Sequence, residues 1–166
     1  MLRQYRVFVP LILVVIISAY MAFLLRPSDK RRIIKNLNQV CTILSKVENE
    51  NPALVALKMF DFARFCADQV NIAIAEAPFN GNYSNEMLIS DASRYRAMCE
   101  TLTLTILDYE LELEGDDRAY VQGTLKVKLR ALGEVYEEMI PLQIHLRKFE
   151  RTWKITRVED VKVFKQ

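Results

Sequence analysis

The amino-acid sequence predicts an α+β domain in which N-terminal helices pack on a bent four-stranded antiparallel meander, preceded by one transmembrane helix. Three observations predict this fold class. Residues 7–25 form one apolar run, the next apolar residues recur at helical spacing, and those after Glu100 alternate with polar residues. With 166 residues, the chain has room for one domain beyond an anchor.

The N-terminal run predicts a membrane anchor. Its nineteen residues, 7–25, hold no charge. At about 1.5 Å per residue, a helix of this length spans roughly 28 Å, close to the hydrocarbon thickness of a bilayer. A cleaved signal peptide is the alternative, but its apolar region is usually only ~7–15 residues long, and the exit from Met21 to Arg26 is a poor cleavage site. We therefore expect residues 1–27 to be an uncleaved single-pass anchor in the lipid bilayer, and residues 28–166 to form the domain.

The positive charge of the chain is concentrated beside this run. Residues 1–35 carry seven basic side chains and one acidic one, whereas residues 36–166 carry sixteen basic and twenty acidic ones, a formal charge of −4. An acidic domain argues against nucleic-acid binding, which draws its affinity from neutralised phosphates. The basic residues flanking the predicted span are Arg3, Arg6, Arg26, Lys30, Arg31, Arg32 and Lys35. Most of them follow the span, which favours a cytoplasmic domain and would attract anionic headgroups there.

Three helices and a short strand are expected in the first part of the domain. Ser28 is placed to cap the first helix, Pro52 to begin the second and Ser84 to cap the third. Alternation over residues 70–75 predicts a short strand, and residues 78–82 a turn. The expected apolar stripes are Ile33, Ile34, Leu37, Val40, Cys41, Leu44 and Val47 in the first helix, Leu54, Val55, Leu57, Met59, Phe60, Phe62, Ala63 and Phe65 in the second, and Met87, Leu88, Ala92, Tyr95 and Met98 in the third.

Four strands are expected after Glu100, separated by turns at Gly115 and Gly133 and by a last turn before Trp153. In the first of them the apolar parity switches after Ile106, which indicates a bulge or a bend. Consecutive antiparallel strands of this kind form a meander with one apolar face. The amphipathic helices are expected to cover that face.

The cysteines and the single histidine do not indicate a metal centre. Cys41, Cys66 and Cys99 are an odd number without a close pair, and they are typical of small buried apolar residues. Because His145 is the only histidine and no ligand cluster accompanies it, we expect neither a metal nor a cofactor. One disulfide between two of the three remains open in an oxidising compartment.

The order of the elements and the closing stretch carry a resemblance. Residues 151–158, with Trp153 and Ile155 facing inward, and the succession of helices and bent meander resemble the cone-shaped nuclear transport factor 2-like (SnoaL-like) superfamily. The chain from Pro27 also resembles a bacterial membrane-anchored group with such a domain, over residues 27–31, 51–54, 66–70 and 81–84. This resemblance implies a domain outside the cytoplasm at the inner (cell) membrane, opposite to the side that the charges favour.

Because the cone of this superfamily often encloses a pocket, a base inside the cone is the feature to look for. The parity of its strand points His145 to the outer face of the sheet, so we assign it no catalytic role. Asp61 and Asp68 could reach a pocket mouth, although Asp68 is more typical of a helix end or turn. Aromatic and Met side chains that could line a cavity, but that are more often plain core, are Phe65, Tyr95, Met98, Tyr109, Tyr136 and Trp153.

A basic stripe of Lys126, Lys128 and Arg130 is expected on one strand, with Glu137 and Glu138 placed to pair with it. We expect a membrane-tethered, non-enzymatic interaction or ligand-binding domain that forms a homodimer, or binds another protein, through the outer sheet face. An isomerase-like or dehydratase-like enzyme using the cone pocket is one alternative. An envelope-assembly subunit is another, by analogy of layout alone.

Overall fold

The computed structural model describes residues 28–74 and 80–161. The chain divides into two compact units, Met1–Arg32 and Ile33–Gln166, and the fold given below is that of the second. The predicted anchor at residues 7–25 lies outside the described residues, and no helix within the described ranges is long and apolar enough to cross a membrane. The elements are α2 (Asp29–Leu44), α3 (Pro52–Arg64), β1 (Cys66–Ala73), β2 (Gly81–Ser84), α4 (Asn85–Met98), β3 (Thr101–Glu114), β4 (Arg118–Ala131), β5 (Glu134–Phe149) and β6 (Thr152–Asp160).

The helices α3 and α4 begin at the predicted residues. Pro52 takes the first position of α3, where a missing N–H costs little, and the Asn51 side chain accepts a hydrogen bond from the Ala53 N–H at 2.9 Å. Ser84 caps α4, because its hydroxyl accepts a hydrogen bond from the Met87 N–H at 3.3 Å. Both predicted starts are therefore confirmed.

The sheet has six strands among the described residues, in the order β2-β1-β6-β5-β4-β3. Strands β3 to β6 form the predicted antiparallel meander, but the expectation of four strands is wrong because β1 and β2 extend the sheet. Strand β1 runs parallel to β6, with Ile72 opposite Val158, and antiparallel to β2. A parallel pair joins segments that are distant in the sequence, so no local pattern reveals it.

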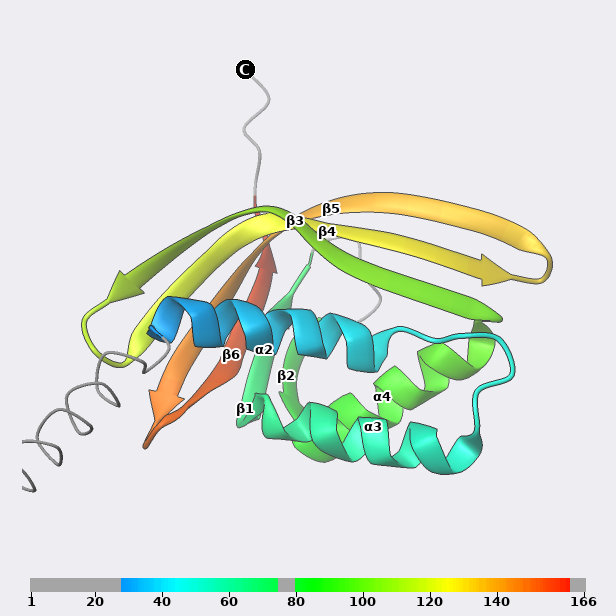
Figure 1. Ribbon diagram of the computed structural model, residues 1–166, viewed down its shortest axis with the longest axis horizontal. Helices are drawn as coiled ribbons and strands as arrows, with labels where there is room; N and C mark the ends of the chain where they lie inside the picture. Colours follow the sequence, from blue (N-terminus) through cyan, green and yellow to red (C-terminus); the bar gives the residue numbers. More distant parts are fainter. Residues whose placement is uncertain (1–27, 75–79, 162–166) are drawn as a thin grey trace, which may run out of the picture. The chain divides into compact units, whose positions relative to one another are not determined.

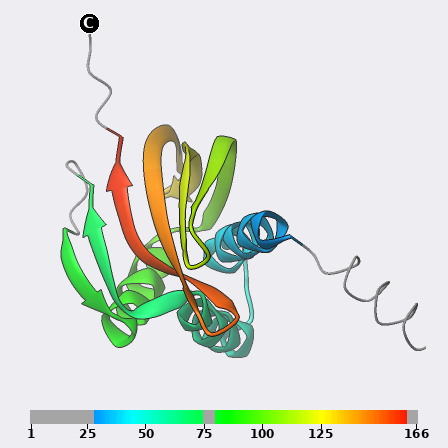
Figure 2. The same cartoon turned by 90° about the vertical axis from the view of Figure 1, so that its left-hand side faces the viewer.

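The three helices lie on one side of the bent sheet (Figures 1 and 2). One apolar core fills the space between the two layers, and Trp153 at its centre is 2 % exposed. The buried residues of this core are Ile33, Leu37, Val40, Phe62, Cys66, Val70, Leu88, Ala119, Val121, Leu142, Ile144, Leu146, Trp153 and Ile155.

The apolar stripes predicted for the helices are only partly correct. In α4 the buried side chains are Leu88 and Arg96, while Met87 and Met98 are exposed. In α3 only Met59 and Phe62 are buried. Other members of the predicted stripes are exposed: Val47, Leu54, Leu57 and Phe60. The helices are apolar on more sides than the domain covers.

The predicted bulge in β3 is confirmed. The register of β3 against β4 shifts between Leu107 and Glu110, and Asp108 takes a φ of 47°. Gly123 lies opposite the bulge. A Cβ at position 123 would lie 3.1 Å from both the Leu107 carbonyl oxygen and the Tyr109 Cβ, so this close approach favours glycine.

Strands β4 and β5 continue as a projecting hairpin (Figure 1). Strand β6 ends at Asp160, opposite Leu142, and the Val161 N–H donates to the Pro141 carbonyl oxygen at 3.1 Å, so within the described chain residues 134–140 of β5 pair with β4 alone. The two-residue turn of the hairpin consists of Leu132 and Gly133, with φ of 53° and 80°. This is the twist that a tight hairpin favours, and it leaves the Leu132 side chain 98 % exposed.

Candidate functional site

An apolar core lies between the helices and the sheet in the described part of the chain. Two thiols, of Cys41 and Cys66, lie in this core. Burial raises the pKa of Cys41 to about 11. Burial also raises the pKa of Cys66, to about 12, against an opposing effect of the Lys154 charge. Both thiols are therefore protonated near neutral pH and are poor nucleophiles.

The residues proposed as pocket lining differ widely in their exposure to solvent. Trp153 is buried in the core, and Phe65 is partly buried and packs against that core. Tyr95 is half-buried on α4. Asp61 is exposed and pairs with Arg64 at 3.5 Å, whereas Asp68 is exposed within β1 and is not the helix-end or turn residue expected from the sequence. The remaining three are exposed: Met98, Tyr109 and Tyr136.

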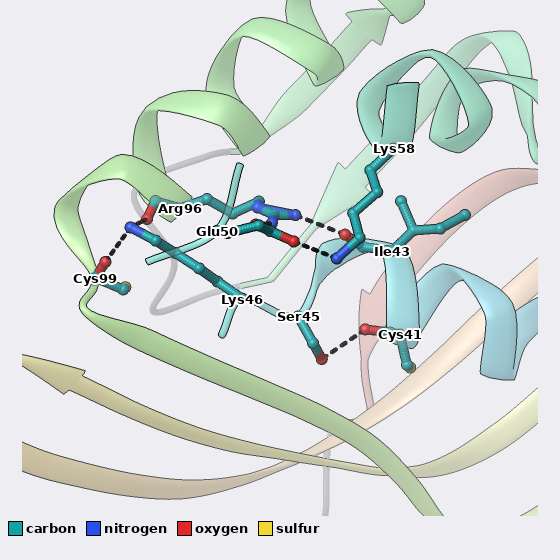
Figure 3. Close-up of polar contacts among 8 residues, drawn as sticks. All are labelled: Cys41, Ile43, Ser45, Lys46, Glu50, Lys58, Arg96 and Cys99. Carbon is teal, nitrogen blue, oxygen red and sulfur yellow. Dashed lines mark hydrogen bonds and ion pairs between the residues drawn. The ribbon is translucent and has the colours of Figure 1, made fainter. Parts of the chain in front are cut away.

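A charged cluster that the sequence analysis did not find joins the ends of two helices (Figure 3). Lys46, just beyond α2, donates its ammonium to the carbonyl oxygens of Arg96 and Cys99 at the end of α4, at 3.0 and 2.5 Å. Arg96, on α4, donates from Nη1 to the carbonyl oxygen of Ile43 near the end of α2, at 2.6 Å. Lys46, which follows α2, thus caps the carboxyl end of α4, and Arg96 of α4 caps the carboxyl end of α2. The helix dipole favours positive charge at both places.

Glu50 completes this cluster from the loop between α2 and α3. Its carboxylate binds both the Arg96 guanidinium and the Lys58 ammonium, and the side chains of Glu50 and Arg96 are 5 % and 4 % exposed. Burial on its own would raise the pKa of Glu50, but the hydrogen bonds and charges of Lys58 and Arg96 outweigh burial and lower the pKa. The charged groups of this cluster bind one another and the ends of the helices, so we interpret the cluster as a structural link between α2, α3 and α4.

The signal for this cluster was present in α4. Arg96 follows Leu88 and Ala92 at intervals of four residues, so it shares their buried face. A charged residue on a buried face needs a partner. Nothing local identifies that partner as Glu50, which lies before α3, with α3, β1 and β2 between it and α4.

The outer face of the sheet carries the polar groups. His145 lies there, as its strand parity predicts, with Nε2 2.6 Å from the Glu159 carboxylate, which also accepts a hydrogen bond from Arg157 at 2.7 Å. The Tyr120 ring meets the His145 ring edge to face at 5.0 Å. The strand registers place one polar row across all six strands: Asn82, Asn71, Arg157, His145, Tyr120 and Glu112.

The predicted basic stripe lies on the same face. Lys126 pairs with Glu137 at 2.7 Å, which confirms one of the two expected pairs. Glu138 is opposite Val127, so its side chain has the parity of the inner face and cannot join the stripe.

An open cleft of about 630 Å³ lies where β1, β2 and β6 meet, and it is not part of the core. Its polar lining includes Asn71, Asn80, Arg157 and Glu159, and the last two are already engaged with each other. No group of three His, Cys, Asp or Glu side chains within the described ranges could hold a metal ion.

Comparison with known proteins places the fold. No family model and no curated protein matches the sequence. Among solved structures, the chain is similar to an NTF2-like protein with a cystatin-like fold from Novosphingobium aromaticivorans, with a TM-score of 0.63, 11% identity and 90% of each chain covered. It is also similar to an NTF2-like protein from Cytophaga hutchinsonii, with a TM-score of 0.60, 13% identity and coverage of 80% of this chain and 97% of the other.

A third similar structure is the hexachlorocyclohexane dehydrochlorinase LinA-type3 from Novosphingobium barchaimii. Its TM-score is 0.64 at 9% identity, and the match covers 81% of this chain and 86% of the other. At these identities the likeness concerns the fold alone. It confirms the nuclear transport factor 2-like fold that the resemblance implies.

Proposed function

From this nuclear transport factor 2-like fold, we propose that the protein is a membrane-tethered, non-enzymatic interaction domain whose outer sheet face binds a protein, either a second copy of the chain or another protein of the envelope. The observation that carries the proposal is the distribution of polarity. The described core between helices and sheet is apolar, while a polar row crosses the outer face of the six described strands. Chemistry in the cone would need a base there, and the described core supplies thiols of raised pKa instead.

The charges on the outer face support a partner of complementary charge. Glu110, Glu112 and Glu114 share one side of β3, and they lie opposite Gln122, Tyr120 and Arg118 of β4. Lys126, Lys128 and Arg130 have the same parity further along β4. Charges of both signs, separated along one surface, favour specific orientation of a partner more than raw affinity.

The proposed anchor at residues 7–25 supports a role in assembly, because tethering in two dimensions raises the effective concentration of a membrane partner. We place the domain outside the cytoplasm, following the bacterial group that the chain resembles. The basic cluster from Arg26 to Lys35 predicts the opposite side. Topology is therefore tested directly.

For topology, Lys126→Cys is introduced together with Cys99→Ser, and intact cells are treated with a membrane-impermeant maleimide. An extracytoplasmic domain is labelled before lysis. Labelling only after lysis would place the domain in the cytoplasm, and the Cys99→Ser chain without the new cysteine is the control for background reaction.

For the partner, a photo-crosslinking phenylalanine replaces Tyr120 on the outer face, and in a matched control it replaces Tyr136, whose parity is that of the inner face. We expect a discrete adduct from position 120 only, and the added Glu112→Lys substitution to lower its yield about tenfold. An adduct of twice the chain mass identifies a homodimer, and another discrete mass identifies a different protein. No adduct at position 120, or equal adducts at both positions, would contradict the proposed face.

A further inference from the structure

Helix α3 is apolar on two opposite sides, and the domain covers only one of them. Met59 and Phe62 are buried at 3 % and 7 % exposure. Leu54, Leu57 and Phe60 are exposed at 53 %, 62 % and 69 %. Because these three residues follow at intervals of three, they form one stripe along the outward side of the helix.

The outward stripe is exposed to solvent in the described part of the chain. A surface helix normally turns charged residues to water, and a contiguous exposed apolar stripe marks a contact surface. On this side of α3 the charged residues are Asp61 and Arg64, which pair with each other near the carboxyl end of the helix at 3.5 Å. The rest of the outward side, from Ala53 to Phe60, includes Ala56 and carries no exposed acidic group.

The chain before α2 restricts what can cover this stripe. The proposed span ends at Leu25, and Asp29 begins α2. Three residues lie between them and reach at most ~11 Å when extended. A domain on so short a tether stays at the membrane surface, whichever side of the membrane it occupies.

We propose that α3 is a second membrane contact: it lies in the plane of the bilayer interface with Leu54, Leu57 and Phe60 inserted among the lipid headgroups and upper acyl chains. The inference rests on the proposed anchor. An amphipathic helix binds in this way through its buried apolar area, to a depth of roughly 5–10 Å. The helices lie on one side of the sheet (Figure 1), so this contact leaves the outer sheet face open to a partner in the aqueous compartment.

The contact is tested in the full-length chain, reconstituted in vesicles of phosphatidylcholine with a minority of phosphatidylglycerol. Leu57→Cys, in a Cys99→Ser background, carries an environment-sensitive fluorophore, and nitroxide-labelled phospholipid serves as the quencher. The matched control is Leu132→Cys, at the tip of the β4–β5 hairpin and 98 % exposed. We expect the label at position 57 to be quenched at least about twofold more than the label at position 132.

Two double variants separate the stripe from general proximity to the membrane. With the fluorophore at Leu54→Cys, the added Leu57→Gln and Phe60→Gln substitutions are expected to abolish the excess quenching. Val135→Gln with Met139→Gln, which removes two equally exposed apolar side chains from β5, is expected to leave it unchanged. Intrinsic fluorescence of the buried Trp153 verifies that each variant is folded.

The other outcomes overturn the inference. A label at position 57 that is shielded from water but not quenched by lipid would mean that protein covers the stripe. If the shielding falls as the protein is diluted in the membrane, a second copy of the chain covers the stripe. If the shielding does not change on dilution, residues 1–27 of the same chain cover it. Failure of the chain to float with vesicles would remove the anchor, and with it both the proposed function and this inference.

Discussion

At the scale of single residues, the fold buries the ion pair of Arg96 and Glu50. Two charges taken out of water cost several kcal/mol each, and they are tolerated only when their hydrogen bonds are made. Here the guanidinium meets a carboxylate and a helix-end carbonyl, while the carboxylate meets two cations. Such a cluster fixes the relative orientation of the helices more reliably than it raises the free energy of unfolding, because only one arrangement of the helices lets all of these bonds form.

Replacing Arg96 by Met is expected to destabilise the protein by about 3 kcal/mol, because it removes the cap of α2 and leaves Glu50 with Lys58 as its only cation partner in the cluster. Chemical unfolding of the full chain in detergent micelles, followed by Trp153 fluorescence, measures the change. Arg94→Met is the control, because Arg94 is exposed and pairs with Asp91 on the surface. Equal losses of stability from the two substitutions would contradict a special role for the buried cluster.

The lowered pKa of Glu50 predicts how stability depends on pH. A carboxyl whose pKa is lower in the folded chain than in the unfolded chain stabilises the fold above the unfolded pKa. That contribution is lost as the pH falls through the lower, folded pKa. The difference in unfolding free energy between the wild-type chain and Glu50→Gln is therefore expected to be constant near neutral pH and to shrink below the ordinary carboxyl range. A difference that grows on acidification would contradict the direction of the shift.

At the scale of elements, the bulge in β3 and the glycine opposite it act as one device. The bulge lets both Ile106 and Leu111 pack against the core despite the change of parity. Gly123→Ala is expected to destabilise the fold by roughly 1–3 kcal/mol, because the new methyl group meets backbone that cannot move without disturbing the ladder. Gly115→Ala shows whether this loss exceeds a purely conformational one, because Gly115 has a φ of 66° but open space around it. A smaller loss at position 123 than at position 115 would argue against the close contact.

The helices and strands differ in how well the sequence predicts them. Caps, turns and parity gave the starts of α3 and α4, the meander and the bulge, because these are local effects of φ preference and hydrogen bonding. The alternation over residues 70–75 predicts only part of β1, because β1 pairs in parallel with the distant β6. Strand β2, which is four residues long and pairs with β1, is not predicted. The buried side of α4 was misjudged because Met87 and Met98 were favoured over Arg96, whose partner lies on a distant loop.

At the scale of the whole molecule, Cys41 and Cys66 lie in the core, so their thiols should be unreactive in the folded chain. A disulfide reagent at mildly alkaline pH is expected to modify Cys99 alone in the folded chain, because Cys41 and Cys66 are buried with raised pKa values, and all three after unfolding. The count of reacted thiols is measured by absorbance, and Cys99→Ser should abolish the native reaction. Fast modification of Cys66 would mean that the interior opens on that timescale.

The reciprocal capping of α2 and α4 has a consequence for how the molecule opens. Helix ends ordinarily fray one at a time, and their last amides exchange with solvent at little cost. Here the Lys46 ammonium is bound to the end of α4, and the Arg96 guanidinium to the end of α2. Neither end can unwind without releasing the cation that caps the other. The last amides of the two helices therefore belong to one cooperative opening unit and exchange with a common protection factor, although they lie about fifty residues apart in the chain.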